Sequence, residues 1–386
     1  MDSYISSAAA LADAVAGFRQ AAIVAADTEA ASYHKYVDRI YLVQLSTGTH
    51  TAIIDPLALT DLAPLGALLA DPQVEKVFHD ADYDLRILDR DYGFRARRLF
   101  DTRIAAQLAG EPAIGLASLL QMYCGVKLSK AHQKADWSQR PLPPAMLAYA
   151  AADTEHLPAL RQALRARLIA LGRLPWAEEE FERLESLRWT GSPDGRGASP
   201  DAYLHVKGAK ALSLRSLAAF RELHRWRESV AAREDKAPFR IIGNAPLLAV
   251  SRTLADSPSA LTRVPDLPAS LARRHGAALV AGVRCALALP ESELPRPERA
   301  PRGGSGGPGG GGPRDRGLEE RVERLKAARN RVAAALGLDP GVLCGRVALE
   351  AVARARPNNR AGLAQLSELR RWQIDVLGDA LLGALG

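Results

Sequence analysis

The pattern of apolar and polar positions changes near residue 170. Before that point, short apolar runs alternate with longer amphipathic segments, which is typical of strands interleaved with helices. Strands are expected at residues 21–26, at 39–46 with alternating polarity, and at 51–54, where Asp55-Pro56 ends the run. A further short strand (74–79) and helices at 62–70, 81–91, after Asp101 and at 143–171 follow. This order predicts an α/β domain, a mixed sheet flanked by helices.

After residue 170 the pattern is almost entirely helical, with apolar residues recurring at the spacing of one helix face. Segments rich in Gly, Pro, Ser and Asp interrupt it. We therefore expect an α/β domain at 1–171, a connector at 172–205, a helical domain at 206–292, a flexible Gly/Pro/Arg-rich linker at 293–317 and a second helical domain at 318–386. The last segment has the pattern of a diverged repeat of residues 206–292.

Positive charge is concentrated in the helical part of the 386-residue chain. Residues 1–170 carry 17 Lys and Arg against 19 Asp and Glu, whereas residues 171–386 carry 34 against 25. Such an asymmetry suits a nearly neutral catalytic domain joined to a region that binds a polyanion such as nucleic acid. The abundance of arginine also allows genome composition as a partial explanation.

Several classes of protein are excluded by composition. Three cysteines without a C-x-x-C pair do not support a disulfide scaffold or a cysteine-based zinc finger, and they fit a reducing cytoplasm. The longest apolar stretch, residues 277–289, is interrupted by Arg284 and is too short to span a bilayer, so no membrane association is expected. The first residues lack the basic segment of an export signal.

Two carboxylates follow the first buried strand. Asp27 and Glu29 are two residues apart, so a continued strand places both side chains on one face. Two like charges beside apolar residues repel each other unless a cation compensates them. Oxygen ligands without Cys or His favour Mg²⁺ or Mn²⁺. The ordinary alternative is that Asp27 caps a turn and Glu29 is solvated.

Three more polar residues lie where they can join this pair. Asp84 is in a helix that directly follows the strand ending at His79. Tyr149 and Asp153 are four residues apart in a helical segment, and hence on one face. Asp153 follows an apolar run, where an unpaired carboxylate is costly. A half-buried hydrogen-bonded pair of Tyr149 and Asp153 without catalytic function is the alternative.

Together these residues resemble the three exonuclease motifs of the DEDD superfamily in its tyrosine-containing branch. Flanking segments extend the resemblance to the ribonuclease D family over residues 1–170, which implies a ribonuclease H-like exonuclease fold. These segments are Val43-Gln44-Leu45, Ile54-Asp55-Pro56-Leu57, Phe100-Asp101-Thr102 and Asp136-Trp137-Ser138-Gln139-Arg140-Pro141-Leu142.

The helical part resembles HRDC domains, the modules shared by ribonuclease D and RecQ-type helicases. Residues 206–292 carry this resemblance through Leu223–Glu228 and Ile242-Gly243-Asn244. Residues 318–386 fit a second domain of the same type less closely. The predicted fold is therefore the exonuclease domain followed by one or two small all-α HRDC-type domains.

The resemblance implies roles for the five motif residues. The carboxylates of Asp27, Glu29, Asp84 and Asp153 would hold two divalent ions, Mg²⁺ or Mn²⁺, about 3.5–4 Å apart, as in two-metal nucleases. Tyr149 would be the fifth catalytic residue. Because the reference pKa of tyrosine is about 10, we expect Tyr149 to orient the attacking water by a hydrogen bond and not to remove its proton.

Substrate binding is expected from Gln44, His79, Lys127, Lys130 and Trp137. Gln44 and His79 stand at expected strand ends and could bond the terminal ribose or phosphate, or simply cap those strands in solvent. Lys127 and Lys130 could follow a phosphate backbone while Trp137 stacks on a base. Alternatively this segment is a solvated loop that Trp137 anchors to the domain.

The resemblance and the residues together predict a metal-dependent 3′–5′ exoribonuclease. We expect it to trim tRNA precursors and other small structured RNAs, to release nucleoside 5′-monophosphates, and to act as a cytoplasmic monomer. One alternative is a 3′–5′ DNA exonuclease in repair, because no residue must read a 2′-hydroxyl. A catalytically inactive nucleic-acid-binding adaptor is the other.

Overall fold

The computed structural model describes residues 3–129, 131–191, 201–296 and 316–386. Lys130, residues 192–200 of the expected connector and residues 297–315 of the expected linker lie outside the described part. The chain forms two compact units. The first comprises Met1–Ala30, Ile40–Trp189 and Pro308–Gly386, and the second comprises Ala31–Arg39 and Thr190–Gly307.

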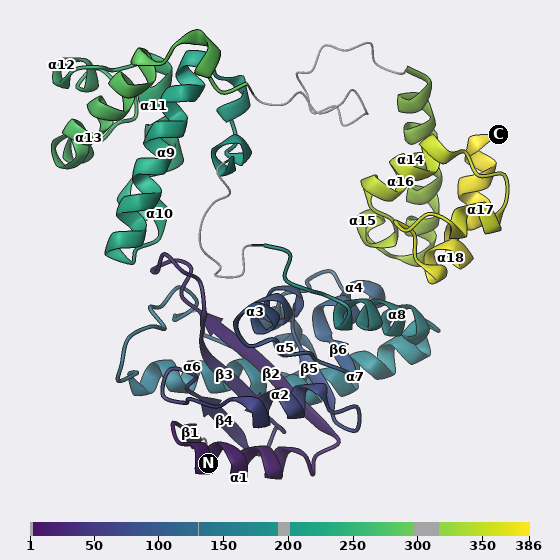
Figure 1. Ribbon diagram of the computed structural model, residues 1–386. Helices are drawn as coiled ribbons and strands as arrows, with labels where there is room; N and C mark the ends of the chain where they lie inside the picture. Colours follow the sequence, from purple (N-terminus) through teal and green to yellow (C-terminus); the bar gives the residue numbers. More distant parts are fainter. Residues whose placement is uncertain (1–2, 130, 192–200, 297–315) are drawn as a thin grey trace. The chain divides into compact units, whose positions relative to one another are not determined.

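A six-stranded mixed sheet forms the core of the first unit (Figure 1). Its strands, in chain order, are β1 (Ser3–Ile5), β2 (Ile23–Ala30), β3 (Ile40–Ser46), β4 (Thr51–Ile54), β5 (Glu75–Phe78) and β6 (Leu99–Asp101). The spatial order is β1-β4-β3-β2-β5-β6. β3 runs antiparallel to both β2 and β4, whereas β1 with β4, β2 with β5 and β5 with β6 are parallel. β2 is therefore a central strand.

Helices flank this sheet, as predicted (Figure 1). They are α1 (Ala8–Phe18), α2 (Ala63–Ala70), α3 (Asp82–Tyr92), α4 (Thr102–Ala109), α5 (Leu116–Cys124), α6 (Pro144–Glu155), α7 (Leu157–Ala170) and α8 (Leu174–Glu185). α6 packs against β2, β3 and β4, and α7 packs against β2 and β5. α3 ends at Gly93, whose φ of 67° is the left-handed conformation that glycine adopts at little cost.

The structure differs from the expected elements in several places. The single helix expected at 143–171 is two helices, α6 and α7, which meet at His156 because Pro158 lacks the amide that would continue the hydrogen-bond ladder. β1, β6, α1 and α5 were not expected; strands of three residues carry too little periodicity to be detected. The expected connector contains α8, whose Phe181 is buried in the same core as the sheet.

The second unit is built from helices after two short 3₁₀ turns. Its helices are α9 (Leu214–Glu234), α10 (Pro238–Ile241), α11 (Asn244–Thr253), α12 (Pro258–Leu261) and α13 (Ala269–Ala288); the 3₁₀ turns are η1 (Ala202–His205), η2 (Ala209–Ala211) and, after α13, η3 (Glu291–Glu293). α9 packs on α11 and α13 around a core that includes Phe220 and Leu223.

No helix among the described residues of either unit is long and apolar enough to cross a membrane.

The C-terminal residues form the same five-helix arrangement inside the first unit. These helices are α14 (Arg316–Leu336), α15 (Pro340–Leu343), α16 (Arg346–Ala355), α17 (Arg360–Ala364) and α18 (Arg371–Leu385). Each of the five begins 102 positions after its counterpart in α9–α13. Arg227 and Arg329, also 102 positions apart, are both buried and donate to the carbonyl oxygens of Ile242 and Cys344 respectively. The two segments are diverged repeats.

The C-terminal repeat packs against α4 and α8 of the first unit. The rings of Trp176 and Trp372 are stacked with centroids 5.0 Å apart, and the Trp372 indole N–H donates to Glu180. Arg173 donates to the carbonyl oxygen of Leu336.

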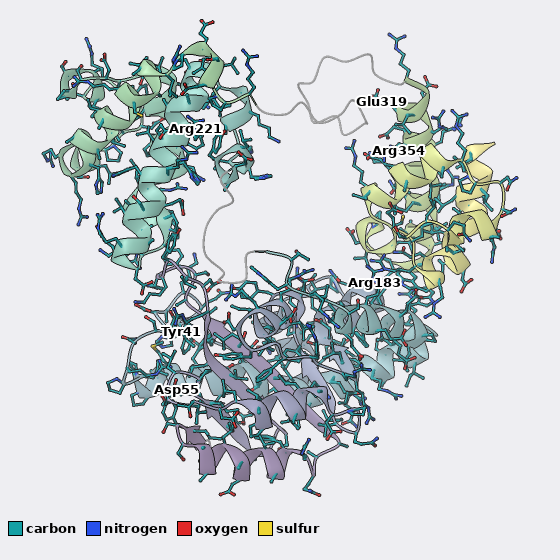
Figure 2. The ribbon with its side chains drawn as sticks, viewed as in Figure 1. Tyr41, Asp55, Arg183, Arg221, Glu319 and Arg354 are labelled. Carbon is teal, nitrogen blue, oxygen red and sulfur yellow. The ribbon has the colours of Figure 1, made fainter. Side chains whose placement is uncertain are left out.

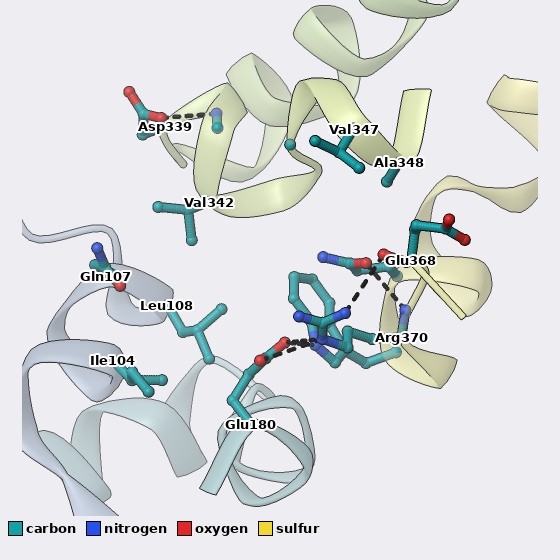
Figure 3. Close-up of a pocket in the computed structure, with 14 residues that line it drawn as sticks. Ile104, Gln107, Leu108, Glu180, Asp339, Val342, Val347, Ala348, Glu368 and Arg370 are labelled. Atoms are coloured by element: carbon teal, nitrogen blue, oxygen red, sulfur yellow. Dashed lines mark hydrogen bonds and ion pairs between the residues drawn. The ribbon is translucent and has the colours of Figure 1, made fainter. Parts of the chain in front are cut away.

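Beside these contacts is a cavity of about 610 Å³ (Figure 3). It is lined by Ile104, Gln107, Leu108, Glu180, Asp339, Gly341, Val342, Gly345, Val347, Ala348, Glu368, Arg370, Trp372 and Gln373.

Candidate active site

Three carboxylates from β2 and α6 gather at the centre of the sheet. Asp27 and Glu29 share one face of β2 because strand side chains alternate. Asp153 comes from the last turn of α6, which packs against β2. Carboxylate oxygens of all three residues lie within 4.8 Å of one another. Residues of the first and the third sequence motif therefore lie together in space.

The same group is electrostatically unfavourable without a cation. Burial, followed by the charges of Asp84, Glu29 and Asp153, holds the pKa of Asp27 well above its usual range. Burial and the charges of Asp153 and Asp84 raise the pKa of Glu29 to about 9, and burial raises the pKa of Asp153 to about 6. Oxygen ligands at this separation, with no Cys or His, fit a hard divalent cation.

Asp84 is the fourth carboxylate and lies beside the group of three. It is in the first turn of α3, where its Oδ1 accepts a hydrogen bond from the hydroxyl of Thr28 on β2. Its charge contributes to the raised pKa values of Asp27 and Glu29, so it belongs to the same electrostatic site. The sequence did not indicate the role of Thr28. Side chains alternate along a strand, so Thr28 is expected on the opposite face of β2 from Asp27.

Tyr149 lies one helical turn before Asp153 and forms a hydrogen bond with its side chain. Burial, followed by the charges of Asp153 and Glu29, raises the pKa of Tyr149 further above 10. The phenol therefore stays protonated and acts as a hydrogen-bond donor. Its ring contacts the rings of His132 and Trp137, with centroid separations of 5.7 and 6.1 Å respectively.

Gln44 is buried opposite Asp27. The two residues are paired in the register of β2 and β3, and Gln44 has no exposed surface. Neither its amide nitrogen nor its amide oxygen has a hydrogen-bond partner among the described residues. The solvated strand-end alternative for Gln44 is excluded by this burial. An amide without partners at such a position calls for an explanation, because desolvation without a hydrogen bond costs about 1–3 kcal/mol.

His79 faces a hydroxyl and not a carboxylate. The hydroxyl of Thr102 donates to the carbonyl oxygen of Phe78, so it accepts from Nδ1 of His79, 2.9 Å away. Burial lowers the pKa of His79 to about 4. The imidazole is therefore neutral at pH 7, with Nε2 left as an acceptor.

The segment expected to bind a phosphate backbone gives a mixed result. Lys127 is exposed, and Lys130 lies outside the described residues. The expectation that Trp137 stacks on a base needs correction, because its side chain is only 1% exposed. Trp137 instead anchors its loop and contacts the ring of Tyr149.

Arg140 holds that loop against the sheet. Its guanidinium bonds both oxygens of Asp55 at 2.6 and 2.7 Å, and it also donates to the carbonyl oxygens of Tyr41 and Trp137 at 2.9 Å. Tyr41 is in β3, and Asp55 directly follows β4, the neighbouring strand; both residues are labelled in Figure 2. A bidentate arginine–carboxylate pair is among the stronger polar contacts in proteins. The Arg140–Asp55 pair positions the residues that lead into α6.

Comparison with known families agrees with this arrangement. Residues 3–169 match the family described as 3′–5′ exonuclease, and the HRDC domain family matches twice, at residues 216–283 and 319–385. The two HRDC matches coincide with the two helical repeats. The fold expected from the sequence is therefore confirmed, including the second helical domain.

Individual relatives carry the similarity over most of the chain. A ribonuclease D of Gluconacetobacter diazotrophicus is 35% identical over 288 residues, which is 74% of this chain and 72% of the relative. A ribonuclease D of Pseudomonas paraeruginosa is 30% identical over 98% of this chain and 96% of its own length. The crystal structure of Escherichia coli RNase D aligns with a TM-score of 0.68 at 28% identity, covering 99% of this chain and 98% of that one.

Proposed function

The chain belongs to the ribonuclease D family and is a 3′–5′ exoribonuclease, and we propose that it trims the 3′ ends of tRNA precursors and other small structured RNAs. The RNase D of Escherichia coli is described as an exoribonuclease involved in structured RNA processing, which supports this class of substrate. The observation that carries the catalytic part is the convergence of Asp27, Glu29 and Asp153 within 4.8 Å.

We propose that these three carboxylates, with Asp84, bind two divalent cations, Mg²⁺ or Mn²⁺. Such ions, when bound, lower the pKa of a water molecule and neutralise charge on the reacting phosphate. The donor set supports them, since it is all-oxygen and its raised pKa values reflect burial first and the mutual repulsion of the carboxylates second. The hydroxyl of Thr28 donates to Oδ1 of Asp84 and so holds this carboxylate beside the other three.

Hydrolysis at this site forms one bond from water oxygen to phosphorus and breaks the bond to the 3′ oxygen of the preceding nucleotide. The product is a nucleoside 5′-monophosphate. We propose that the Tyr149 hydroxyl orients the attacking water, supported by its protonated state and its bond to Asp153. The packing of Trp137 and His132 around the ring supports a fixed orientation for that hydroxyl.

We further propose that Gln44 contacts the terminal nucleotide at the carboxylates. Its unpartnered amide opposite Asp27 supports this role, because a ribose or phosphate oxygen would supply the missing partner. His79, through its free Nε2, and Lys127, through its exposed ammonium, are proposed to bind more of the RNA. The two HRDC repeats and the excess of basic residues after residue 170 support a grip on structured RNA.

The test compares matched RNA and DNA oligonucleotides, single-stranded and with a 3′ tail on a hairpin, in Mg²⁺ and in Mn²⁺. We expect RNA to be shortened from its 3′ end with mononucleotide products, and a tRNA precursor to lose its 3′ extension. Asp27→Asn and Asp153→Asn should abolish hydrolysis while RNA binding remains. Preferential hydrolysis of DNA would contradict the proposed substrate, and retained activity in both variants would contradict the proposed site.

A further inference from the structure

The second unit displays an aromatic pair that its own fold does not explain. Tyr33 and Phe239 are 46% and 48% exposed, and their ring centroids are 5.0 Å apart. Only four Tyr, Phe or Trp side chains among the described residues are exposed, and these two are in contact although they are far apart in sequence. Exposed aromatic rings are the common platform for stacking nucleic-acid bases.

A rigid turn presents Phe239. It lies in α10, a single helical turn whose neighbours Ala237 and Ile241 are buried, so Phe239 and Arg240 face outward. The buried Arg227 fixes the end of this turn by donating to the carbonyl oxygen of Ile242 and to the side chain of Asn244, the latter at 2.6 Å. The backbone that carries the ring is therefore held in place, which limits the conformational freedom lost on binding.

Tyr33 reaches the same turn from the segment that follows β2. The carbonyl oxygen of His34 accepts from the amide of Ala237 at 3.1 Å, and Lys35 forms an ion pair with Asp235 at 2.9 Å. The guanidinium of Arg240 lies 2.5 Å from Nδ1 of His34. These contacts fasten residues 31–39 to the first HRDC repeat and bring a basic residue beside the aromatic pair.

The second repeat provides an internal comparison for this turn. At the positions 102 residues later, Phe239 and Arg240 are replaced by Gly341 and Val342, although the turn has the same bounds and the same buried arginine. Val342 lines the cavity beside the nuclease domain (Figure 3). The repeat therefore folds without an aromatic and a basic residue here, so the turn itself does not need Phe239 and Arg240 in order to form.

We propose that Tyr33 and Phe239 stack on an unpaired base of the RNA and that Arg240 contacts the adjacent phosphate. Three residues separate Tyr33 from Glu29, so the chain keeps the two Cα atoms within about 14 Å of each other. The site thus receives a nucleotide a short distance upstream of the 3′ end that is being hydrolysed. This inference rests on RNA as the substrate of the chain.

The experiment measures RNA binding by fluorescence anisotropy in the full chain carrying Asp153→Asn, so that the RNA is not consumed. Tyr33→Leu and Phe239→Leu keep an apolar contact but remove the aromatic faces. We expect each to weaken binding of a single-stranded 8-mer roughly ten-fold with the salt dependence unchanged. Arg240→Gln should instead reduce the slope of log affinity against log salt by about 0.7, the value for one phosphate contact of a single strand.

Position and controls complete the test. RNAs with 2-aminopurine placed at successive nucleotides should show quenching at one upstream position, and that quenching should disappear in Phe239→Leu. Leu287→Ala, an exposed apolar residue of the same unit, should leave affinity unchanged. Thermal unfolding of each variant shows whether it is folded.

Two outcomes separate this inference from the proposed function. Normal affinity in both folded leucine variants, with a wild-type chain that hydrolyses RNA, would overturn the stacking site alone. Hydrolysis is measured in Tyr33→Leu and Phe239→Leu chains that keep Asp153. If hydrolysis of a dinucleotide, which has only one nucleotide upstream of its 3′ end, falls as much as that of the 8-mer, the defect lies at the carboxylates and the stacking site is again wrong. A wild-type chain that does not hydrolyse RNA would overturn the proposed function instead.

Discussion

The carboxylate of Asp101 accepts a hydrogen bond from the backbone amide of Ala81, with Oδ2 2.7 Å from the nitrogen. Ala81 is the N-cap of α3 and has no side chain that could cap the helix. Asp101 supplies the missing acceptor and also receives the amides of Arg103 and Ile104 at the start of α4. It therefore fixes the helix end that carries Asp84.

We expect Asp101→Asn to weaken cation binding as well as folding. The side chain of asparagine has one accepting oxygen in place of two. Its NH₂ group would therefore face one of the three backbone N–H groups that now donate to Asp101. The free energy of unfolding should fall by about 1–3 kcal/mol, and Mn²⁺ affinity measured by calorimetry should decrease because Asp84 shifts. Asp339→Asn, which alters the cap of α15, is the matched control and should leave Mn²⁺ binding unchanged. Equal Mn²⁺ affinity in both variants would restrict Asp101 to a capping role.

The Arg140–Asp55 pair should affect catalysis through Tyr149. Arg140→Lys keeps the charge but cannot form the bidentate pair or bond the carbonyl oxygen of Trp137 at the same time. We expect kcat to fall about ten- to a hundred-fold, as for a displacement of about 1 Å near reacting groups, with a smaller change in KM. Steady-state hydrolysis of a short RNA measures both constants.

The control for Arg140 is another bidentate pair in the same domain. Arg161 bonds both oxygens of Glu75, at 2.5 and 2.9 Å, and its guanidinium lies over the ring of Phe100, so these contacts are with β5 and β6. Arg161→Lys should reduce stability without the same loss of kcat. A similar loss of kcat in both variants would mean that the effect is general destabilisation.

Without divalent cations, stability should fall as pH rises. The pKa of Glu29 is raised from 4.5 to about 9 in the folded chain, so between these values the folded state holds a proton that the unfolded state has released. The free energy of unfolding therefore decreases with pH across this range. Thermal unfolding in EDTA should show the decrease, and excess Mn²⁺ should diminish it because cations stabilise the ionised carboxylates.

Substitution of Glu29 tests this linkage directly. Glu29→Gln should flatten the pH dependence in EDTA and abolish most of the stabilisation by Mn²⁺. Glu155→Gln, an exposed residue at the end of α6, serves as the control and should change neither quantity. A melting temperature that increases with pH in EDTA would show that the cluster is not held protonated.

Removing the amide of Gln44 should raise stability and lower activity. Leucine has a similar volume and no polar atoms, so Gln44→Leu removes the cost of an unpartnered buried amide, about 1–3 kcal/mol. We expect slower hydrolysis and a higher KM for RNA, because the terminal nucleotide loses a partner. Gln373→Leu is the contrasting control, since its buried oxygen accepts from the amide of Arg370 and its removal should destabilise. Lower stability of Gln44→Leu would mean that the amide is already satisfied.

Local periodicity indicated which residues of the centre share a face, but it left ordinary alternatives open for both pairs. Asp27 with Glu29, and Tyr149 with Asp153, lie at the strand and helix spacings that place side chains on one face, so their pairing could be read from the sequence. The family resemblance then connected them with Asp84. Once the fold was known from this resemblance, the meeting of β2, α3 and α6 at one site followed from it.

Contacts between distant segments were not predictable in the same way. Arg140 and Asp55 are 85 residues apart, and Asp101 caps a helix that begins 19 positions before it. No spacing rule relates such residues. The burial of Trp137 was also ambiguous, because a tryptophan in a basic segment can equally stack on a base or anchor a loop; tertiary packing decided for the anchor.

The second repeat is attached to the nuclease domain at the start of α18. Glu179 accepts from the amides of Arg371 and Trp372 at the start of α18, where the helix dipole favours a carboxylate. With the stacked Trp176 and Trp372 rings, this makes the repeat part of the folded first unit and not an independent module. Trp372→Ala should lower the free energy of unfolding by about 3–5 kcal/mol and increase amide exchange in α8.

The half-buried Trp226 of the second unit is the control, and Trp226→Ala should leave exchange in α8 unchanged. A deletion of the second repeat would expose the same surface, so its effect on structured RNA would combine lost grip with lost stability. Trp372→Ala separates the two, because the basic residues remain. If exchange in α8 is unaffected, the two domains are not held together by this contact, and loss of processing on deletion would then report RNA binding alone.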